Sequence, residues 1–137
     1  MDRRKARKEA FCAIYEYYFN NGEVAVEDII RREQAERGIE KDEYLDAVCL
    51  GVVNNTEKLD AIIEKYLKGW KMRRISKVSL SILRLAVYEL ACMEAIPVNV
   101  SANEAVELAK LYDDDAAPAF INGVLGAYLR ELEAAEQ

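Results

Sequence analysis

Apolar residues recur three or four positions apart along almost the whole chain. The run Ala10, Phe11, Ile14, Tyr17 and Tyr18 is typical, and no segment shows the sustained apolar–polar alternation of a half-buried strand. Side chains at these spacings lie on one face of a helix and can pack together. The pattern therefore predicts an all-α protein of about seven helices.

Turn-forming and capping residues set the limits of the expected helices. These helices cover residues 3–20, 26–37, 42–53, a segment from Thr56 that fades at Gly69 and Trp70, 78–93, a segment that includes 102–109, and one that starts near Pro118 and runs toward a polar end at 133–137. Asp42 and Thr56 are expected N-caps, because short polar side chains can accept a hydrogen bond from the first turn. The sixth helix either begins with Pro97 in its first turn or is capped by Ser101, and the sequence leaves both open.

The segment 78–93 differs from the others because its apolar residues cover most of the helix circumference. Such a helix is expected to be buried on all sides. Short loops join the other helices, so the chain is predicted to be a bundle with this helix at its centre. At 137 residues, the simplest organisation is a single domain covering 1–137.

The chain begins with a concentrated group of cations. Arg3, Arg4, Lys5, Arg7 and Lys8 lie within the first eight residues, whereas the whole chain has a net charge of −6. Cations are disfavoured at the start of a helix, where the helix dipole is positive, so their placement there suggests a use that offsets the cost. A basic stripe of this kind can follow a phosphate backbone. The alternative is a solvated helix end without a binding role.

A second basic region covers residues 65–77, which contain no acidic residue. It contains Lys71, Arg73, Arg74 and Lys77, with Trp70 near its middle. Read as a secondary RNA-binding loop, its cations would meet phosphates and the indole would stack on an unpaired base. We favour a structural role for Trp70 as a core plug at a helix end, because buried aromatic residues are commoner than stacking platforms.

The sequence offers little for enzymatic or metal chemistry. It has no histidine, and Cys12, Cys49 and Cys92 are far apart in apolar helical segments, so we expect three buried thiols and no zinc site. Nucleophiles that need a histidine base are excluded. The run 113–115 of three aspartates lacks the glycine and glutamate of a calcium loop, and its last aspartate is expected to cap the next helix. We expect no catalysis, metal or cofactor.

No apolar run approaches the roughly 20 residues of a membrane span, so we expect a cytoplasmic protein without membrane contact.

Gly123 and Gly126 lie inside the last expected helix, where each costs about 1 kcal/mol relative to alanine. We expect them where another helix, or the backbone of a partner, approaches closely.

Five short segments follow one another in a specific order. They are RIS at 74–76, ILRLAVYEL at 82–90, IP at 96–97, NEAVELAK at 103–110 and FINGVL at 120–125. Together with the basic start, they make the chain resemble the NusB family of transcription antitermination factors. The resemblance implies two small packed helical bundles. It also implies binding to NusE, a ribosomal protein of the small subunit, and to boxA-type single-stranded RNA in ribosomal RNA leaders.

The resemblance also assigns an RNA surface by position. Its residues would be Arg3, Arg4, Lys5, Arg7, Lys8, Arg84, Asp115 and Phe120. The chain departs from the usual family pattern at two places. Lys77, Ser79 and Leu80 stand where Pro, Asp and Arg are usual, and Asp113 with Ala119 makes the loop before the last helix more acidic.

The leading hypothesis is a non-enzymatic RNA-binding adaptor that works with NusE in the transcription elongation complex on ribosomal RNA operons. The alternative is a helical protein-interaction module, or a homodimer, that acts without direct RNA contact. NusB-like domains also occur in ribosomal RNA methyltransferases, but this chain shows no cofactor-binding Rossmann segment, so we do not expect methyl transfer.

Overall fold

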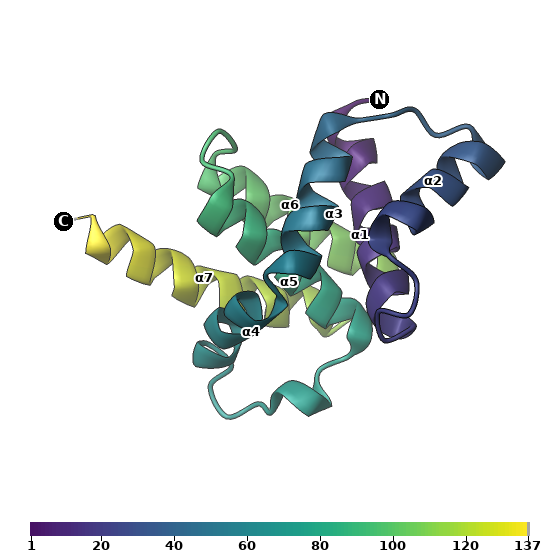
Figure 1. The fold of residues 1–137 in the computed structure, drawn as a ribbon. Helices are drawn as coiled ribbons and strands as arrows, with labels where there is room; N and C mark the ends of the chain where they lie inside the picture. The colour runs from purple at the N-terminus through teal and green to yellow at the C-terminus, as the bar shows by residue number, and fades with distance from the viewer. Residues whose placement is uncertain (137) are drawn as a thin grey trace.

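The computed structural model describes residues 1–136 and contains seven α-helices and one short 3-10 turn in that range (Figure 1). The elements are α1 (Arg3–Phe19), α2 (Val26–Arg37), α3 (Glu43–Asn54), α4 (Thr56–Lys65), η1 (Met72–Arg74), α5 (Lys77–Cys92), α6 (Val98–Tyr112) and α7 (Ala117–Ala135). No strand occurs within residues 1–136, so the all-α prediction is confirmed. None of these helices combines the length and the apolar composition that crossing a bilayer requires.

Helix α5 is the centre of the structure. It packs against α1, α3, α4, α6 and α7, and every side chain from Ser81 to Val87 is buried. A helix surrounded on all sides must be apolar around its circumference, as this one is. The predicted central helix is therefore confirmed.

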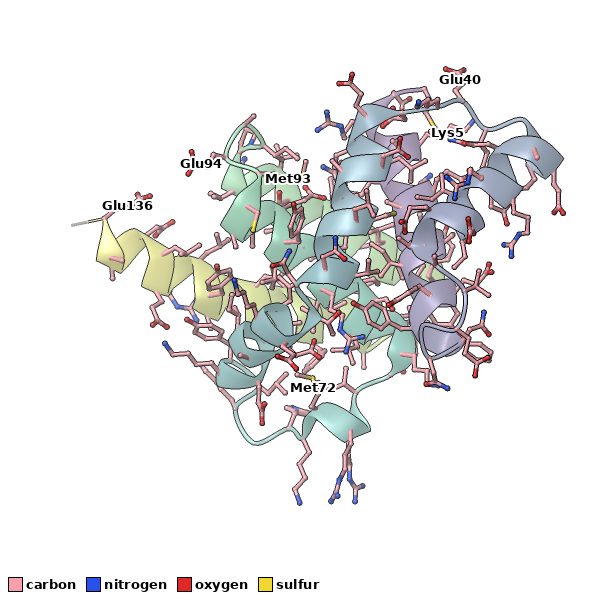
Figure 2. All side chains as sticks on the ribbon, viewed as in Figure 1. Lys5, Glu40, Met72, Met93, Glu94 and Glu136 are labelled. Atoms are coloured by element: carbon pink, nitrogen blue, oxygen red, sulfur yellow. The ribbon has the colours of Figure 1, made fainter. Side chains whose placement is uncertain are left out.

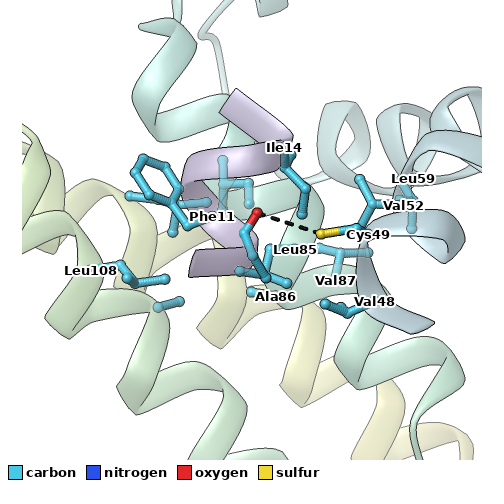
Figure 3. Packing of buried hydrophobic residues seen from close by; sticks show 14 of the residues in the cluster. Phe11, Ile14, Val48, Cys49, Val52, Leu59, Leu85, Ala86, Val87 and Leu108 are labelled. Carbon is cyan, nitrogen blue, oxygen red and sulfur yellow. Dashed lines mark hydrogen bonds between the residues drawn. The ribbon is translucent and has the colours of Figure 1, made fainter. Parts of the chain in front are cut away.

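The other helices pack in two groups around α5. Helices α1, α2 and α3 contact one another, α6 packs on α7, and α4 lies against α5. The buried apolar side chains of both groups form one continuous cluster. Figure 3 shows a part of it where α1 and α3 meet, with the Cys49 Sγ donating to the Ala10 carbonyl oxygen over 3.8 Å. Both groups thus share a single core.

Three of the expected helix starts can be compared with the structure. Asp42 caps α3, because its Oδ1 accepts a hydrogen bond from the Leu45 amide at 2.9 Å, as predicted. The prediction for Thr56 is wrong: it is the first residue of α4, and its hydroxyl donates to the Val53 carbonyl at 3.2 Å. Helix α6 begins directly after Pro97, so the alternative with Ser101 as the cap is wrong.

The close helix approach expected in α7 occurs elsewhere. A Cβ atom added to Gly123 would meet nothing within 4 Å, and one on Gly126 would meet only an Arg130 guanidinium nitrogen at 3.5 Å. A Cβ on Gly51 of α3, in contrast, would lie 2.0 Å from the Tyr88 ring of α5. Within this chain the prediction for Gly123 and Gly126 is wrong, and contact with a partner's backbone stays a prediction.

Only one of the three cysteines is buried. Cys49 is fully enclosed between α1 and α3, where burial raises the pKa of its thiol above the ordinary value. Cys12 and Cys92 are exposed, so the expectation of three buried thiols is wrong. Both lie in largely apolar helices, and an apolar run does not say which side of a helix faces solvent.

Candidate nucleic-acid interface

The first turns of α1 carry a group of accessible cations. Arg3, Arg4 and Lys5 are exposed and Lys8 is half-buried. The Asp2 carboxylate caps the helix, because it accepts a hydrogen bond from the Lys5 amide at 2.8 Å. This single anion at the positive end of the helix dipole offsets part of the unfavourable placement of the cations. Figure 2 shows Lys5 beside the N-terminus, at one end of the molecule.

Arg7 does not belong to this accessible group. Its side chain is 3% exposed and forms a two-pronged ion pair with Glu89, with Nε–Oε2 at 2.8 Å and Nη2–Oε1 at 3.0 Å. Burial alone would lower the pKa of Arg7, but the hydrogen bonds to Glu89 outweigh it and the pKa lies above its ordinary value. Neighbouring helices cover the helix turn that carries Arg7, so an RNA contact of Arg7, which stays a prediction, would require the pair with Glu89 to open.

The Glu89 carboxylate is the centre of a buried polar network. Besides Arg7, the Tyr44 hydroxyl donates to it at 2.6 Å and the Ser101 hydroxyl donates at 2.8 Å. Burial and the nearby Glu89 charge raise the pKa of Tyr44, so the phenol stays protonated and remains a donor. Buried polar groups are costly unless all are paired, and here each has a partner. The network links α1, α3, α5 and α6 and fixes the position of the first turns of α1.

Two of the accessible arginines also have defined positions. The Arg3 guanidinium carbon lies 4.4 Å from the centroid of the Tyr44 ring, a cation–π contact. Arg4 donates from Nη2 to Glu104 Oε1 at 2.8 Å, and this hydrogen bond raises the pKa of Arg4. An RNA phosphate that binds Arg4 must therefore compete with the Glu104 carboxylate.

Arg84 is a second arginine of the implied RNA surface that is largely buried and paired, and its RNA contact stays a prediction. Its Nε and Nη2 donate to the two Asp60 carboxylate oxygens at 2.8 and 2.9 Å, and its guanidinium carbon lies 4.0 Å from the centroid of the Tyr18 ring. The side chain is 11% exposed. It lies in the central helix α5, where it joins α4 and α1, and its donors face Asp60 instead of solvent.

The second basic region lies at the other end of the molecule. Figure 2 shows Met72, in the middle of this region, on the opposite side from Lys5. Lys71, Arg73, Arg74 and Lys77 are exposed. The Lys77 ammonium is 5.1 Å from the centroid of the Phe19 ring, at the end of α1. The two basic regions therefore lie near opposite ends of α1, a helix of 17 residues that spans about 24 Å at the helical rise of 1.5 Å per residue.

The aromatic and acidic residues beside this region are arranged as follows. Trp70 is 60% exposed, so its predicted role as a core plug is wrong. Its ring makes an edge-to-face contact with the half-buried Phe120, with centroids 5.7 Å apart. Asp115 is exposed, and α7 begins after Ala116 without a side-chain cap, so the expectation that the last aspartate of the run caps the helix is wrong. The neighbouring Asp114 carboxylate accepts hydrogen bonds from the Ala116 and Ala117 amides.

The two departures Ser79 and Asp113 contact each other. The Ser79 hydroxyl donates to Asp113 Oδ2 at 2.5 Å, and the Ser76 hydroxyl donates to the same oxygen at 2.9 Å. Ser76 is also the N-cap of α5. The acidic residue that the sequence adds to this loop therefore ties the start of α5 to the end of α6. Within residues 1–136, no group of side chains is arranged to hold a metal ion.

An aromatic face along α1 was not singled out by sequence reasoning. The Tyr15 ring is tilted against the rings of Phe11 and Phe19, with centroids 6.2 and 5.9 Å away. The centroid of the Tyr112 ring of α6 lies 4.8 Å from that of Phe11. Together with Val78 these rings line a groove of about 430 Å³. Phe19 is 54% exposed. The available signal was an aromatic residue at every fourth position of α1, of which Phe11 is buried in the core and Phe19 is exposed.

The network around Glu89 was also missed. An acidic residue in a helix that is mostly apolar around its circumference requires a buried partner, and this signal was present in the sequence. The partner itself could not be identified, because Arg7 lies 82 positions away along the chain.

Comparison with known proteins places this geometry in a family. The sequence model of the NusB family matches residues 4–130. The transcription antitermination protein NusB of Listeria monocytogenes serotype 4b (strain CLIP80459) is 42% identical over 125 residues, which cover 91% of this chain and 94% of that protein. The protein of the same name from Bacillus subtilis (strain 168) is 41% identical over 136 residues, covering 97% and 98%.

Solved structures give the same result. A structure of T. maritima NusB superposes with a TM-score of 0.86 at 32% identity and covers 96% of this chain and 92% of that one. A crystal structure of the antitermination factors NusB and NusE in complex with dsRNA matches with a TM-score of 0.79 at 31% identity, covering 93% and 96%. The matches in sequence and in fold extend over nearly the whole chain, and on these grounds it belongs to the NusB family.

Proposed function

We propose that this protein is a transcription antitermination factor that binds RNA together with a NusE-type ribosomal protein. The named relatives are antitermination proteins, and one structural neighbour was solved with NusE and RNA. The observation that carries the proposal is the accessible cationic start of α1, formed by Arg3, Arg4, Lys5 and Lys8 in a chain of net charge −6. In an acidic body, such a concentrated patch favours an oriented contact with a polyanion.

The proposed mechanism is assembly without catalysis. The cations of α1 bind RNA phosphates, and Arg4 exchanges its hydrogen bond with Glu104 for one with a phosphate oxygen. We propose a boxA-type single-stranded segment as the RNA, the transcription elongation complex as the setting and ribosomal RNA operons as the targets. The protein would act in the cytoplasm, where bacterial transcription takes place.

The aromatic groove along α1 is the proposed contact for the NusE-type protein. It is formed by Phe11, Tyr15, Phe19, Val78 and Tyr112, and it begins on the same helix as the cationic start. Phe19 and Tyr112 are exposed in this groove, and exposed aromatic residues are enriched at protein interfaces. A second copy of this chain is the competing occupant of the same groove.

The test combines RNA binding with assembly. A fluorescently labelled boxA-like RNA is titrated with the protein, with and without the NusE-type protein of the same organism, and complexes are sized by gel filtration. The proposal predicts a ternary complex that contains one copy of each protein. It also predicts that Arg3→Ala/Arg4→Ala/Lys5→Ala loses RNA but keeps the partner, whereas Phe19→Ala weakens the partner.

The control is Arg31→Ala/Lys58→Ala/Arg130→Ala, which removes three exposed cations outside both basic regions. It produces the same change in net charge and is expected to bind RNA as the wild type does. A stable dimer of this chain that binds neither RNA nor the NusE-type protein would contradict the proposal and support the interaction module.

A further inference from the structure

A groove of about 270 Å³ lies between the α4–α5 connection and the start of α7. Its lining includes Trp70, Arg74, Ile75, Ser79, Asp114 and Phe120. It combines an exposed indole, an apolar floor, carboxylates on one wall and a cation on another. This combination differs from the start of α1, where no exposed aromatic side chain lies beside the cations in the described residues, and it suggests a ligand that is both flat and charged.

The aromatic pair provides the flat surface. Trp70 is 60% exposed, and its ring meets Phe120 at an interplanar angle of 62°, so the two rings are not stacked face to face. Phe120 supports the indole from the side of α7. An indole held in this way can stack against another flat ring, and stacking of this kind accepts any of the four bases.

The charges around the groove fix how a nucleotide would lie in it. Lys68, Lys71, Arg73 and Arg74 are exposed and form no ion pair within residues 1–136, so their charge is uncompensated. On the inner wall, Asp113 accepts hydrogen bonds from two serines and Asp114 accepts one from the Ala117 amide. These carboxylates repel phosphates but can accept hydrogen bonds from base amino groups. The base is therefore directed inward and the phosphates outward.

We infer that this groove holds one unpaired nucleobase of the bound RNA, stacked on Trp70, while the flanking phosphates lie on the cations of residues 68–77. The inference rests on the proposed function and assigns a second contact to the same RNA. The two contacts lie near opposite ends of α1. The length of α1 is about 24 Å, so a strand that follows this helix from end to end would use roughly seven nucleotides at the duplex rise of 3.4 Å and fewer if it is extended.

The test uses Trp70 as its own probe, because it is the only tryptophan in the chain. Tryptophan emission is followed while a boxA-like RNA is added to the full-length protein, and the anisotropy of labelled RNA is measured in parallel. We expect RNA to quench the emission. We also expect Trp70→Ala to weaken binding about 5- to 150-fold, the range for the loss of one stacked base, and Trp70→Phe to retain most of the affinity. Far-UV circular dichroism checks that the variants are folded, which an exposed position should permit.

The remaining outcomes separate this inference from the proposed function. If labelled RNA binds but leaves the emission of the wild type unchanged, the groove is not a base site and the proposed function stands. The same conclusion follows if Trp70→Ala binds the RNA as tightly as the wild type does. If no RNA binds to any form, both fail. If the NusE-type protein alters the emission and RNA does not, the groove contacts protein and the inference is overturned.

Discussion

Arg7 and Glu89 form a buried two-pronged ion pair in which the side chains are 3% and 1% exposed. The pair lies directly beneath the cationic start of α1, one turn along from Arg3. Two arginines on the same helix, four residues apart, therefore have different roles. Arg3 is available to a ligand, whereas Arg7 holds the helix in place through Glu89, Tyr44 and Ser101.

Removing one member of this pair should destabilise the protein. Arg7→Ala leaves the Glu89 carboxylate buried without its cation, and such a change costs about 3–5 kcal/mol. Urea denaturation followed by circular dichroism measures the loss in the free energy of unfolding. Arg3→Ala is the matched control on the same face of α1 and should be nearly neutral. A fully stable Arg7→Ala variant that fails to bind RNA would return Arg7 to the RNA surface.

Glu104 should restrain RNA binding through Arg4. Glu104→Gln removes the charge that competes with a phosphate for the Arg4 guanidinium, so RNA affinity should rise by at most about fivefold, as expected for an exposed pair. Glu107→Gln changes the net charge equally, but Glu107 accepts its hydrogen bond from Lys110 instead of Arg4. Anisotropy titrations should show a larger gain for Glu104→Gln. Equal gains for both variants would mean that the gain comes from the change in net charge and not from the loss of the Arg4–Glu104 pair.

Two glycines should respond in opposite directions to alanine. Gly51→Ala places a Cβ atom 2.0 Å from the Tyr88 ring, so α3 or the ring must shift, at a cost of about 1–3 kcal/mol. Gly123→Ala meets nothing and should stabilise α7 by up to about 1 kcal/mol. Thermal or urea unfolding checks both. If Gly123→Ala also weakens complexes with the NusE-type protein or with RNA, its open surface in α7 is a partner contact.

The ion pairs of Glu33 within α2 should make the stability of the protein depend on pH. Arg32 and Arg37 donate hydrogen bonds to Glu33 and lower the pKa of that carboxyl below its ordinary value. A lowered folded-state pKa contributes stability above the unfolded-state value near 4.5, and this contribution is lost as the pH falls through the folded-state pKa. Unfolding free energies measured from pH 7 to pH 3 should therefore decline less steeply for Glu33→Gln than for the wild type. Parallel curves would contradict this role.

Residues whose behaviour depends on local spacing could be predicted from the sequence. The central helix α5 followed from its apolar circumference, and the Asp42 cap followed from its position before an apolar run. The cations at the start of α1 were found for the same reason. These features depend on a few neighbouring residues and on the period of the helix.

Residues whose behaviour depends on distant packing could not be placed. The period of α1 puts Arg3 and Arg7 on one face but does not show that α3, α5 and α6 close over the second of them. Trp70 has a large apolar side chain of the kind that is usually buried, yet the path of its loop holds it on the surface. For Arg84, the partner Asp60 lies in another helix, and only the fold brings the two together.

The salt dependence of RNA binding tests the central claim most directly. The dissociation constant for a boxA-like single-stranded RNA is measured at several salt concentrations for the wild type and for Arg3→Ala/Arg4→Ala/Lys5→Ala. Four accessible cations on α1 predict that this region contributes a slope of about −2.8 to the dependence of log K on log salt, at −0.7 per phosphate contact. The slope of the triple variant should be less negative than that of the wild type by about 2.1, because three of the cations are removed, and the variant should remain folded. A wild-type slope near zero, or an equal slope in the folded triple variant, would contradict RNA binding by the start of α1.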